Sequence, residues 1–129
     1  MEFQKRISER VIGCAMTVSS TLGVGFTESV YENALAIELM KSELSFERQK
    51  PLQVSYRNKI VGNFYADFIV EDKLILELKA LSQLRSEHEA QVMNYLKAGN
   101  LNAGLLLNFG SPRLGIKRIV LNYAEHKAI

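Results

Sequence analysis

Apolar residues in the first third of the chain recur at intervals of three and four, the period of a helix. One face of a first helix would carry Ile7, Val11, Ala15, Val18 and Leu22. The sequence of residues 22–25 (LGVG) would break this helix, and Thr27 suits the N-cap of a second one. The second helix would end near residues 42–44, and its apolar stripe would consist of Val30, Ala34, Leu35, Ile37 and Leu39.

The period changes to that of strands after Pro51, which we expect in a charged connection with residues 47–50. Residues 52–56, 60–70 and 74–78 are rich in β-branched, aromatic or leucine side chains, with polar clusters between them. This pattern predicts a three-stranded antiparallel meander with short loops.

A third helix is predicted from residue 86, where Ser86 and Glu89 have the spacing of a capping box, to a stop at Gly99. The apolar run 103–109 suits a strand that is buried on both faces. Residues 110–112 would turn, residues 116–123 would form the last strand, and the tail from Ala124 would be loosely held.

This order of elements predicts one α/β domain over residues 1–129, with a core of about residues 7–123. The predicted sheet is mixed and central, with helices flanking it. The helical crossover between the third and fourth strands favours a parallel pairing of these two strands.

Composition excludes several classes of protein. The single cysteine, Cys14, excludes a disulfide scaffold and suits a small buried side chain, and two histidines with one cysteine cannot form a standard zinc site. No apolar run reaches the roughly 18–20 residues that span a bilayer, so we expect a cytoplasmic protein without membrane contact. Because the formal charge is only +2, binding to nucleic acid would need a local basic patch.

Charged residues lie where a core strand should have none. Glu77 and Lys79 would share one face of the apolar strand that begins at residue 74. Asp67 and Glu77 are equally distant from Asp72 in sequence, so a hairpin with a three-residue loop would place them opposite each other. A two-residue loop would turn the two carboxylates to opposite faces of the sheet.

Two carboxylates this close repel each other unless one is protonated or a cation lies between them. Oxygen ligands select Mg²⁺ or Mn²⁺, and the ammonium group of Lys79 beside them suits phosphate charge or an attacking water. These groups are the components of metal-assisted phosphodiester hydrolysis. A structural ion pair of Glu77 and Lys79 with Asp67 explains the same spacing, and the spacing favours neither interpretation.

The spacing Asp67-x9-Glu77-x-Lys79, on a hairpin after a helix, resembles the PD-(D/E)XK nuclease superfamily. Residues 25–31 (GFTESVY) resemble the GxxExxY motif of a family of small bacterial proteins in that superfamily. Further segments that resemble this family are residues 77–80, 88–91, 94–96 and 104–109. The resemblance extends over about residues 7–121 and implies a restriction-endonuclease-like core, with a helix, three antiparallel strands, a helix and a further strand.

The resemblance also implies roles for single residues. Asp67 and Glu77, with the backbone carbonyl of Leu78, would bind Mg²⁺ or Mn²⁺, and Lys79 would assist the attacking water and the transition state. Glu28 matches an acidic residue that several members add to the metal site. Gln91 would position Lys79 or a scissile phosphate.

Gln91 and Tyr95 resemble the QxxxY motif of RecB-type nucleases and share a helix face. Tyr95, Arg85 and His88 would contact substrate. Simpler roles compete with these assignments: Glu28 would complement the dipole of its helix, Tyr95 would belong to the core and His88 to the surface.

Together these features predict a metal-dependent nuclease that hydrolyses phosphodiester bonds in DNA or RNA. Since the core uses nearly the whole chain, we expect cleavage that is nonspecific or directed by shape, or a protein partner that supplies targeting. A homodimer would place two sites on two strands. One alternative is a non-catalytic nucleic-acid-binding or protein-interaction module that retains the nuclease fold. Another is a phosphodiesterase that acts on a small nucleotide.

Overall fold

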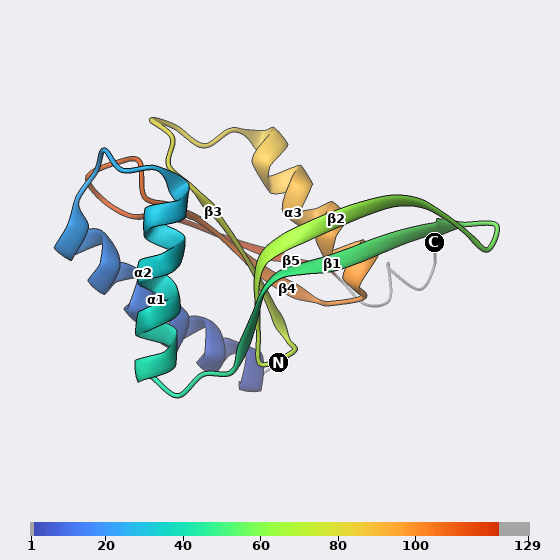
Figure 1. The fold of residues 1–129 in the computed structure, drawn as a ribbon, viewed down its shortest axis with the longest axis horizontal. Helices are drawn as coiled ribbons and strands as arrows, with labels where there is room; N and C mark the ends of the chain where they lie inside the picture. The colour runs from blue at the N-terminus through green and yellow to red at the C-terminus, as the bar shows by residue number, and fades with distance from the viewer. Residues whose placement is uncertain (1, 122–129) are drawn as a thin grey trace.

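The computed structural model describes residues 2–121 of the chain. Its elements, in order, are α1 (Glu2–Leu22), α2 (Glu28–Lys41), β1 (Phe46–Tyr56), β2 (Lys59–Val70), β3 (Leu74–Lys79), α3 (Ser86–Gly99), β4 (Ala103–Asn108) and β5 (Gly115–Val120). The strands form one sheet in the order β1-β2-β3-β4-β5, in which only β3 and β4 are parallel (Figure 1). The predicted order of elements, the mixed sheet and the parallel crossover are therefore confirmed.

Helices cover both faces of this sheet. Leu74, Leu76 and Leu78 of β3 pack into a core cluster with α1 and α2, and Ile75 packs into a second cluster with α3. Residues 104–108 of β4 are buried as well. The central strands thus have apolar side chains on both faces, because helices cover both faces.

The apolar stripe predicted for α2 is wrong in part. Ile37 is 59% exposed, and the buried residues of α2 are Tyr31, Leu35, Ala36 and Leu39. The ring of Tyr31 stacks on Phe109 at 4.8 Å between centroids, which orients a different side of the helix toward the sheet. Thr27 is the N-cap residue as predicted, but its hydroxyl pairs with that of Ser29 and caps no backbone N–H.

β1 begins earlier than predicted. The expected connection through residues 47–50 and Pro51 is wrong, because these residues belong to β1. β1 is an edge strand, so a residue without a backbone N–H can occupy it where no outer partner strand needs that donor. The polar cluster 57–59 is predicted to turn, and Arg57 and Asn58 do so while Lys59 begins β2; their φ angles of 50° and 65° have the signs that a tight two-residue hairpin turn requires.

α3 spans Ser86–Gly99, close to the predicted bounds, but both of its cap residues lie one position away from the predicted ones. The capping box of Ser86 and Glu89 is wrong, because the N-cap is Arg85, whose backbone N–H donates to Nδ1 of His88 at 2.9 Å. At the other end, Asn100 and not Gly99 is the C-cap residue, and it adopts the left-handed conformation. Gly99 instead makes room for β1, because a Cβ there would lie 3.1 Å from a methyl carbon of Leu52.

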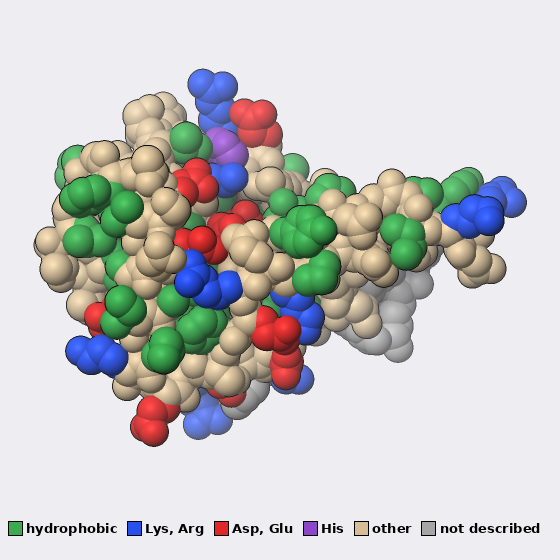
Figure 2. All heavy atoms as spheres, in the orientation of Figure 1, with side chains coloured by type: hydrophobic (Ala, Val, Ile, Leu, Met, Phe, Trp, Pro, Cys, Tyr) green, Lys and Arg blue, Asp and Glu red, His purple; other side chains and the backbone are tan. Residues whose placement is uncertain are grey.

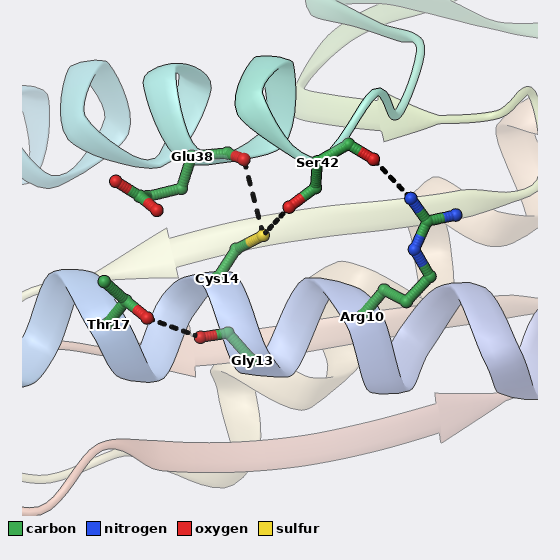
Figure 3. A pocket seen from close by; sticks show the side chains of 6 residues that line it. All are labelled: Arg10, Gly13, Cys14, Thr17, Glu38 and Ser42. Carbon is green, nitrogen blue, oxygen red and sulfur yellow. Dashed lines mark hydrogen bonds between the residues drawn. The ribbon is translucent and has the colours of Figure 1, made fainter.

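β5 ends at Val120, so the last strand predicted for residues 116–123 is confirmed as far as residue 120. Tyr123 and the tail from Ala124 lie outside the described residues. Cys14 is buried as predicted, and its Sγ lies 3.3 Å from the hydroxyl of Ser42 in a groove between α1 and α2 (Figure 3). None of the helices within residues 2–121 has the length and apolar content needed to cross a membrane.

The end of β4 holds the segment that follows β3. The buried Asn108 side chain accepts the backbone N–H of Leu81 at 2.9 Å and donates to the carbonyl of Leu81 at 3.0 Å. The N–H of Phe109 donates to the carbonyl of Lys79 at 2.8 Å. At Gly110 an added Cβ would lie 2.2 Å from the carbonyl oxygen of Leu81, so this position requires glycine.

We expect Gly110→Ala to lower the free energy of unfolding by about 3 kcal/mol, because backbone atoms on both sides must move. Gly13→Ala is the matched control, since Gly13 lies inside α1 with no atom within 4 Å of the added Cβ. This control should raise the free energy of unfolding by up to about 1 kcal/mol. Urea unfolding measures both variants, and equal midpoints would contradict the close contact at Gly110.

Candidate functional site

The β2–β3 hairpin has the register that the site hypothesis requires. Residues 71–73 form the turn, and the cross-strand pairs beyond it are Phe68 with Leu76, Ile69 with Ile75, and Val70 with Leu74. Continuing this register places Asp67 opposite Glu77. The predicted three-residue loop is therefore confirmed.

Side chains replace the regular strand pairing at Asp67 and Glu77. The backbone N–H of Asp67 donates to Oε1 of Glu77 at 2.9 Å, and the backbone N–H of Leu78 donates to Oδ2 of Asp67 at 2.8 Å. Glu77 is only 4% exposed, while Asp67 is half-buried. Each carboxylate is thus anchored by the backbone of the opposite strand.

Gln49 and Glu32 belong to the same cluster and were missed from the sequence. Nε2 of Gln49 donates to Oδ1 of Asp67 at 3.1 Å and to Oε1 of Glu32 at 2.8 Å. The second oxygen of Glu32 pairs with the guanidinium of Arg48 at 3.3 Å. A regular hairpin about residues 57–58 would place Gln49 across from Ala66, and the register shift between Val54 and Ser55 brings it to Asp67 instead.

Burial and mutual repulsion disfavour full ionisation of the carboxylate pair. Burial, and next the charge of Asp67, raise the pKa of Glu77 from 4.5 to about 8, with a smaller contribution from Glu28. Burial also raises the pKa of Asp67, although the N–H of Leu78 and the amide of Gln49 oppose that rise. Without a cation, one carboxyl group of this pair is protonated near neutral pH.

Several other predicted residues act on this pair. The ammonium of Lys79 lowers the pKa of both carboxyl groups, and Glu28, exposed at the start of α2, raises that of Glu77. Burial raises the pKa of Tyr95, and the charges of Glu77 and Asp67 raise it further. Figure 2 shows acidic side chains gathered between the helical part and the projecting β1–β2 hairpin, with basic side chains beside them.

Gln91 and Tyr95 form a pair on α3. Nε2 of Gln91 donates to the hydroxyl of Tyr95 at 3.1 Å, while Oε1 of Gln91 is buried and has no hydrogen-bond partner among residues 2–121. The ring of Tyr95 is buried, and its centroid lies 5.5 Å from the ring centroid of Phe64. Tyr95 therefore has the contacts of a core residue whose hydroxyl is satisfied by a neighbour.

Arg85 and His88 are not joined to the carboxylates by any hydrogen bond or ion pair within the described part of the chain. The exposed guanidinium of Arg85 lies 3.9 Å from Glu87, and Nδ1 of His88 caps α3. Arg85 is the N-cap of α3 and His88 lies in its first turn, N-terminal to Gln91. Their contact with substrate stays a prediction.

The donor set of the carboxylate pair fits a hard divalent cation. Within residues 2–121 no three His, Cys, Asp or Glu side chains converge as a complete metal cage. Mg²⁺ does not need one, because it keeps several waters and binds through one or two carboxylates together with substrate phosphates. Backbone N–H groups orient Asp67 and Glu77, as ligands require, and a cation would remove the repulsion between them.

Comparisons with known proteins agree with this fold. A family model described as the PD-(D/E)XK nuclease superfamily matches residues 5–119. A solved structure described as the crystal structure of SSO0001 matches with a TM-score of 0.60 at 18% identity, a likeness of fold alone. It covers 77% of this chain and 54% of that chain, so this chain spans about half the length of that one. No curated protein matches. The restriction-endonuclease-like fold predicted from the sequence is confirmed.

We expect the free energy of unfolding of the metal-free protein to fall as the pH rises from about 4.5 to about 8. The folded state binds the proton of Glu77 more tightly than the unfolded state does, and this advantage disappears as Glu77 ionises. Glu77→Gln should flatten this part of the profile. Urea unfolding with EDTA, at about pH 5, 6.5 and 8.5, measures the difference.

Glu9→Gln, on the exposed face of α1, is the matched control and should keep the wild-type profile. A Glu77→Gln variant that lost stability with pH as steeply as the wild type would contradict the raised pKa of Glu77.

Proposed function

Because the chain belongs to the PD-(D/E)XK nuclease superfamily, we propose that it is a metal-dependent nuclease that hydrolyses phosphodiester bonds in DNA or RNA. One observation carries the proposal: Asp67 and Glu77 meet at the end of a hairpin, each held by the opposite backbone. Lys79 follows on the same strand, and its charge acts on both carboxylates.

In this proposal Asp67 and Glu77, with the backbone carbonyl of Leu78, hold Mg²⁺ or Mn²⁺. A bound cation would supply Lewis-acid chemistry toward the attacking water and the phosphate. Leu78 supports this arrangement, because its own N–H already binds Asp67 and so keeps the two strands aligned. Glu28 lies near enough to influence the pKa of Glu77 and would add a further oxygen, directly or through water.

Lys79 and Gln91 would act on the water and the phosphate. The ammonium of Lys79 would stabilise the negative charge that develops on the phosphate oxygens. The unpartnered Oε1 of Gln91 would accept a hydrogen bond from Lys79 or from the water, while Tyr95 holds the other end of the amide. Gln49 would keep Asp67 oriented through its bond to Oδ1.

The finer family assignment, to the GxxExxY proteins, rests on residues 25–31. Gly25 has a φ of +110°, which a side chain would disfavour. The hydroxyl of Tyr31 donates to the carbonyl of Gly23 at 2.6 Å and accepts the N–H of Phe26 at 3.3 Å. Gly25 and Tyr31 thus shape the loop that leads to Glu28, which supports a role for the whole motif in positioning this acid.

Asp67→Asn and Lys79→Ala are each expected to slow cleavage at least about 100-fold, because each removes charge at the reacting centre. The assay compares linear, circular and single-stranded DNA and RNA, with Mg²⁺ and with Mn²⁺. Asp72→Asn, in the exposed hairpin turn, is the control and should cleave like the wild type. Wild-type cleavage by a folded Asp67→Asn variant would contradict the proposed site.

A non-catalytic module that retains the fold is the second candidate, favoured by the lack of a third acidic ligand in contact with the pair among residues 2–121. Mn²⁺ binding separates the two candidates. We expect millimolar or tighter binding, with release of up to about one proton near pH 7, because Glu77 must ionise.

Calorimetric titration in buffers of different ionisation enthalpy measures both the affinity and the proton release. Asp67→Asn should lose the binding, and Asp72→Asn should keep it. A folded wild-type protein that bound no Mn²⁺ at millimolar concentration would favour the non-catalytic module.

A further inference from the structure

The hairpin of β1 and β2 extends well beyond the rest of the sheet (Figure 1). β1 pairs with β2 from Val70 out to Lys59, whereas β3 pairs with β2 only from Val70 to Phe68. We call residues 50–66 the arm. Because Asp67 is the next residue, the arm begins at the carboxylate pair.

The charge of the arm differs from that of the chain. It contains three basic residues and no acidic residue, while the whole chain has a formal charge of +2. Lys50, at the base of the arm, pairs with Glu47 at 2.8 Å. The other two basic residues, Arg57 and Lys59, lie at the tip. On the face shown in Figure 2, basic side chains occupy the end of the arm. The tip is therefore a local cationic site on a nearly neutral protein.

At its base the arm has one packed face and one exposed face. Leu52 and Phe64 are cross-strand partners; Leu52 is buried in the cluster under α3, and the ring of Phe64 contacts Tyr95. The next pair outward, Gln53 with Asn63, lies on the other face and is exposed. The exposed face thus presents two adjacent side-chain amides.

Tyr65 shares the exposed face with these amides. It is paired with Pro51 and is 55% exposed. Within the described residues, Gln53, Asn63 and Tyr65 form no side-chain hydrogen bond, so their polar groups are available to a partner.

The tip of the arm is narrow and ordered by its own contacts. Arg57 and Asn58 complete the turn in two residues, both with positive φ. The guanidinium carbon of Arg57 lies 5.6 Å from the ring centroid of Tyr56. A two-residue turn gives the end of the arm the width of two strands.

The geometry points to double-stranded DNA as the partner of this arm, an inference that rests on the proposed function and names its substrate class. A two-stranded ribbon fits the major groove of B-form DNA, about 12 Å wide, whereas the major groove of A-form RNA is too narrow. Gln53 and Asn63 carry the amide groups that pair with base edges, and Arg57 and Lys59 match phosphates.

The length of the arm relates the tip to the carboxylates. From Asp67 to Asn58 the strand rises about 3.3 Å per residue, so the tip lies about 30 Å from the pair, or about nine base pairs of duplex. A duplex along the arm would lead to Asp67 and Glu77.

A second copy of the chain is disfavoured as the partner. Two arms that met at their tips would bring Arg57 and Lys59 of both copies together, and these like charges would repel. Pro51 also removes a hydrogen-bond donor from the outer edge of β1, where another strand would add.

Binding to a duplex of about 20 base pairs, longer than the arm, tests this inference. Fluorescence anisotropy in EDTA scores binding without cleavage, over a series of about 50 to 200 mM salt. The double variant Arg57→Ala with Lys59→Ala should weaken binding about tenfold at the lowest salt, and the slope of log affinity against log salt should fall by about 2.

The control variant, Lys41→Ala with Lys73→Ala, removes the same charge from exposed positions off the arm and should keep the wild-type slope. Gln53→Ala with Asn63→Ala should keep the slope and reduce discrimination among duplexes of different sequence. All of these side chains are exposed, and circular dichroism checks that each variant is folded.

Equal effects of the arm variant and the control variant would overturn the inference. So would stronger arm-dependent binding to duplex RNA, or an arm variant that changes the sedimentation coefficient of the protein but not its DNA affinity. Arm-dependent DNA binding by a wild-type protein that cleaves nothing would support the inference and contradict the proposed function.

Discussion

The structure depends on two hydrogen bonds, from the backbone N–H of Asp67 to Glu77 and from the backbone N–H of Leu78 to Asp67. Each carboxylate accepts a backbone N–H from the opposite strand, so regular pairing of β2 with β3 ends at this point. Beyond it β2 pairs with β1 alone, and the two strands leave the sheet as an arm. One local departure from strand pairing therefore places the charged pair at the root of the arm.

The surroundings of this pair explain how the fold tolerates it. Burying two ionised carboxylates side by side costs free energy, and for this reason the pKa of Glu77 is raised. Backbone N–H groups, the amide of Gln49 and the charge of Lys79 reduce it without removing it. The remaining cost would be removed by a proton or by the cation of the proposed function.

The sequence predicted the elements well where short-range patterns decide them. The helical period of α1, the turns 57–58 and 71–73, and the apolar run of β4 all follow from neighbouring residues. The missed features depend on contacts distant in sequence. Pro51 belongs to a strand because β1 is an edge, and Tyr31 rather than Ile37 faces the core because Phe109 stacks on it. Gln49 could be connected to Asp67 only once the full length of β1 and its register shift against β2 were known.

By itself the sequence limited the register of the central hairpin to two alternatives, since loop length and alternation set which residues oppose each other. The structure selected the three-residue loop, in which Asp67 and Glu77 meet. The tertiary structure alone decided how these side chains are held, how far each is buried and which helix residues reach them. These properties depend on packing between elements far apart in the chain, which local periodicity does not encode. For the same reason the projecting arm became visible only when the sheet was complete: its strands look like any other hairpin until the position where β3 stops pairing is known.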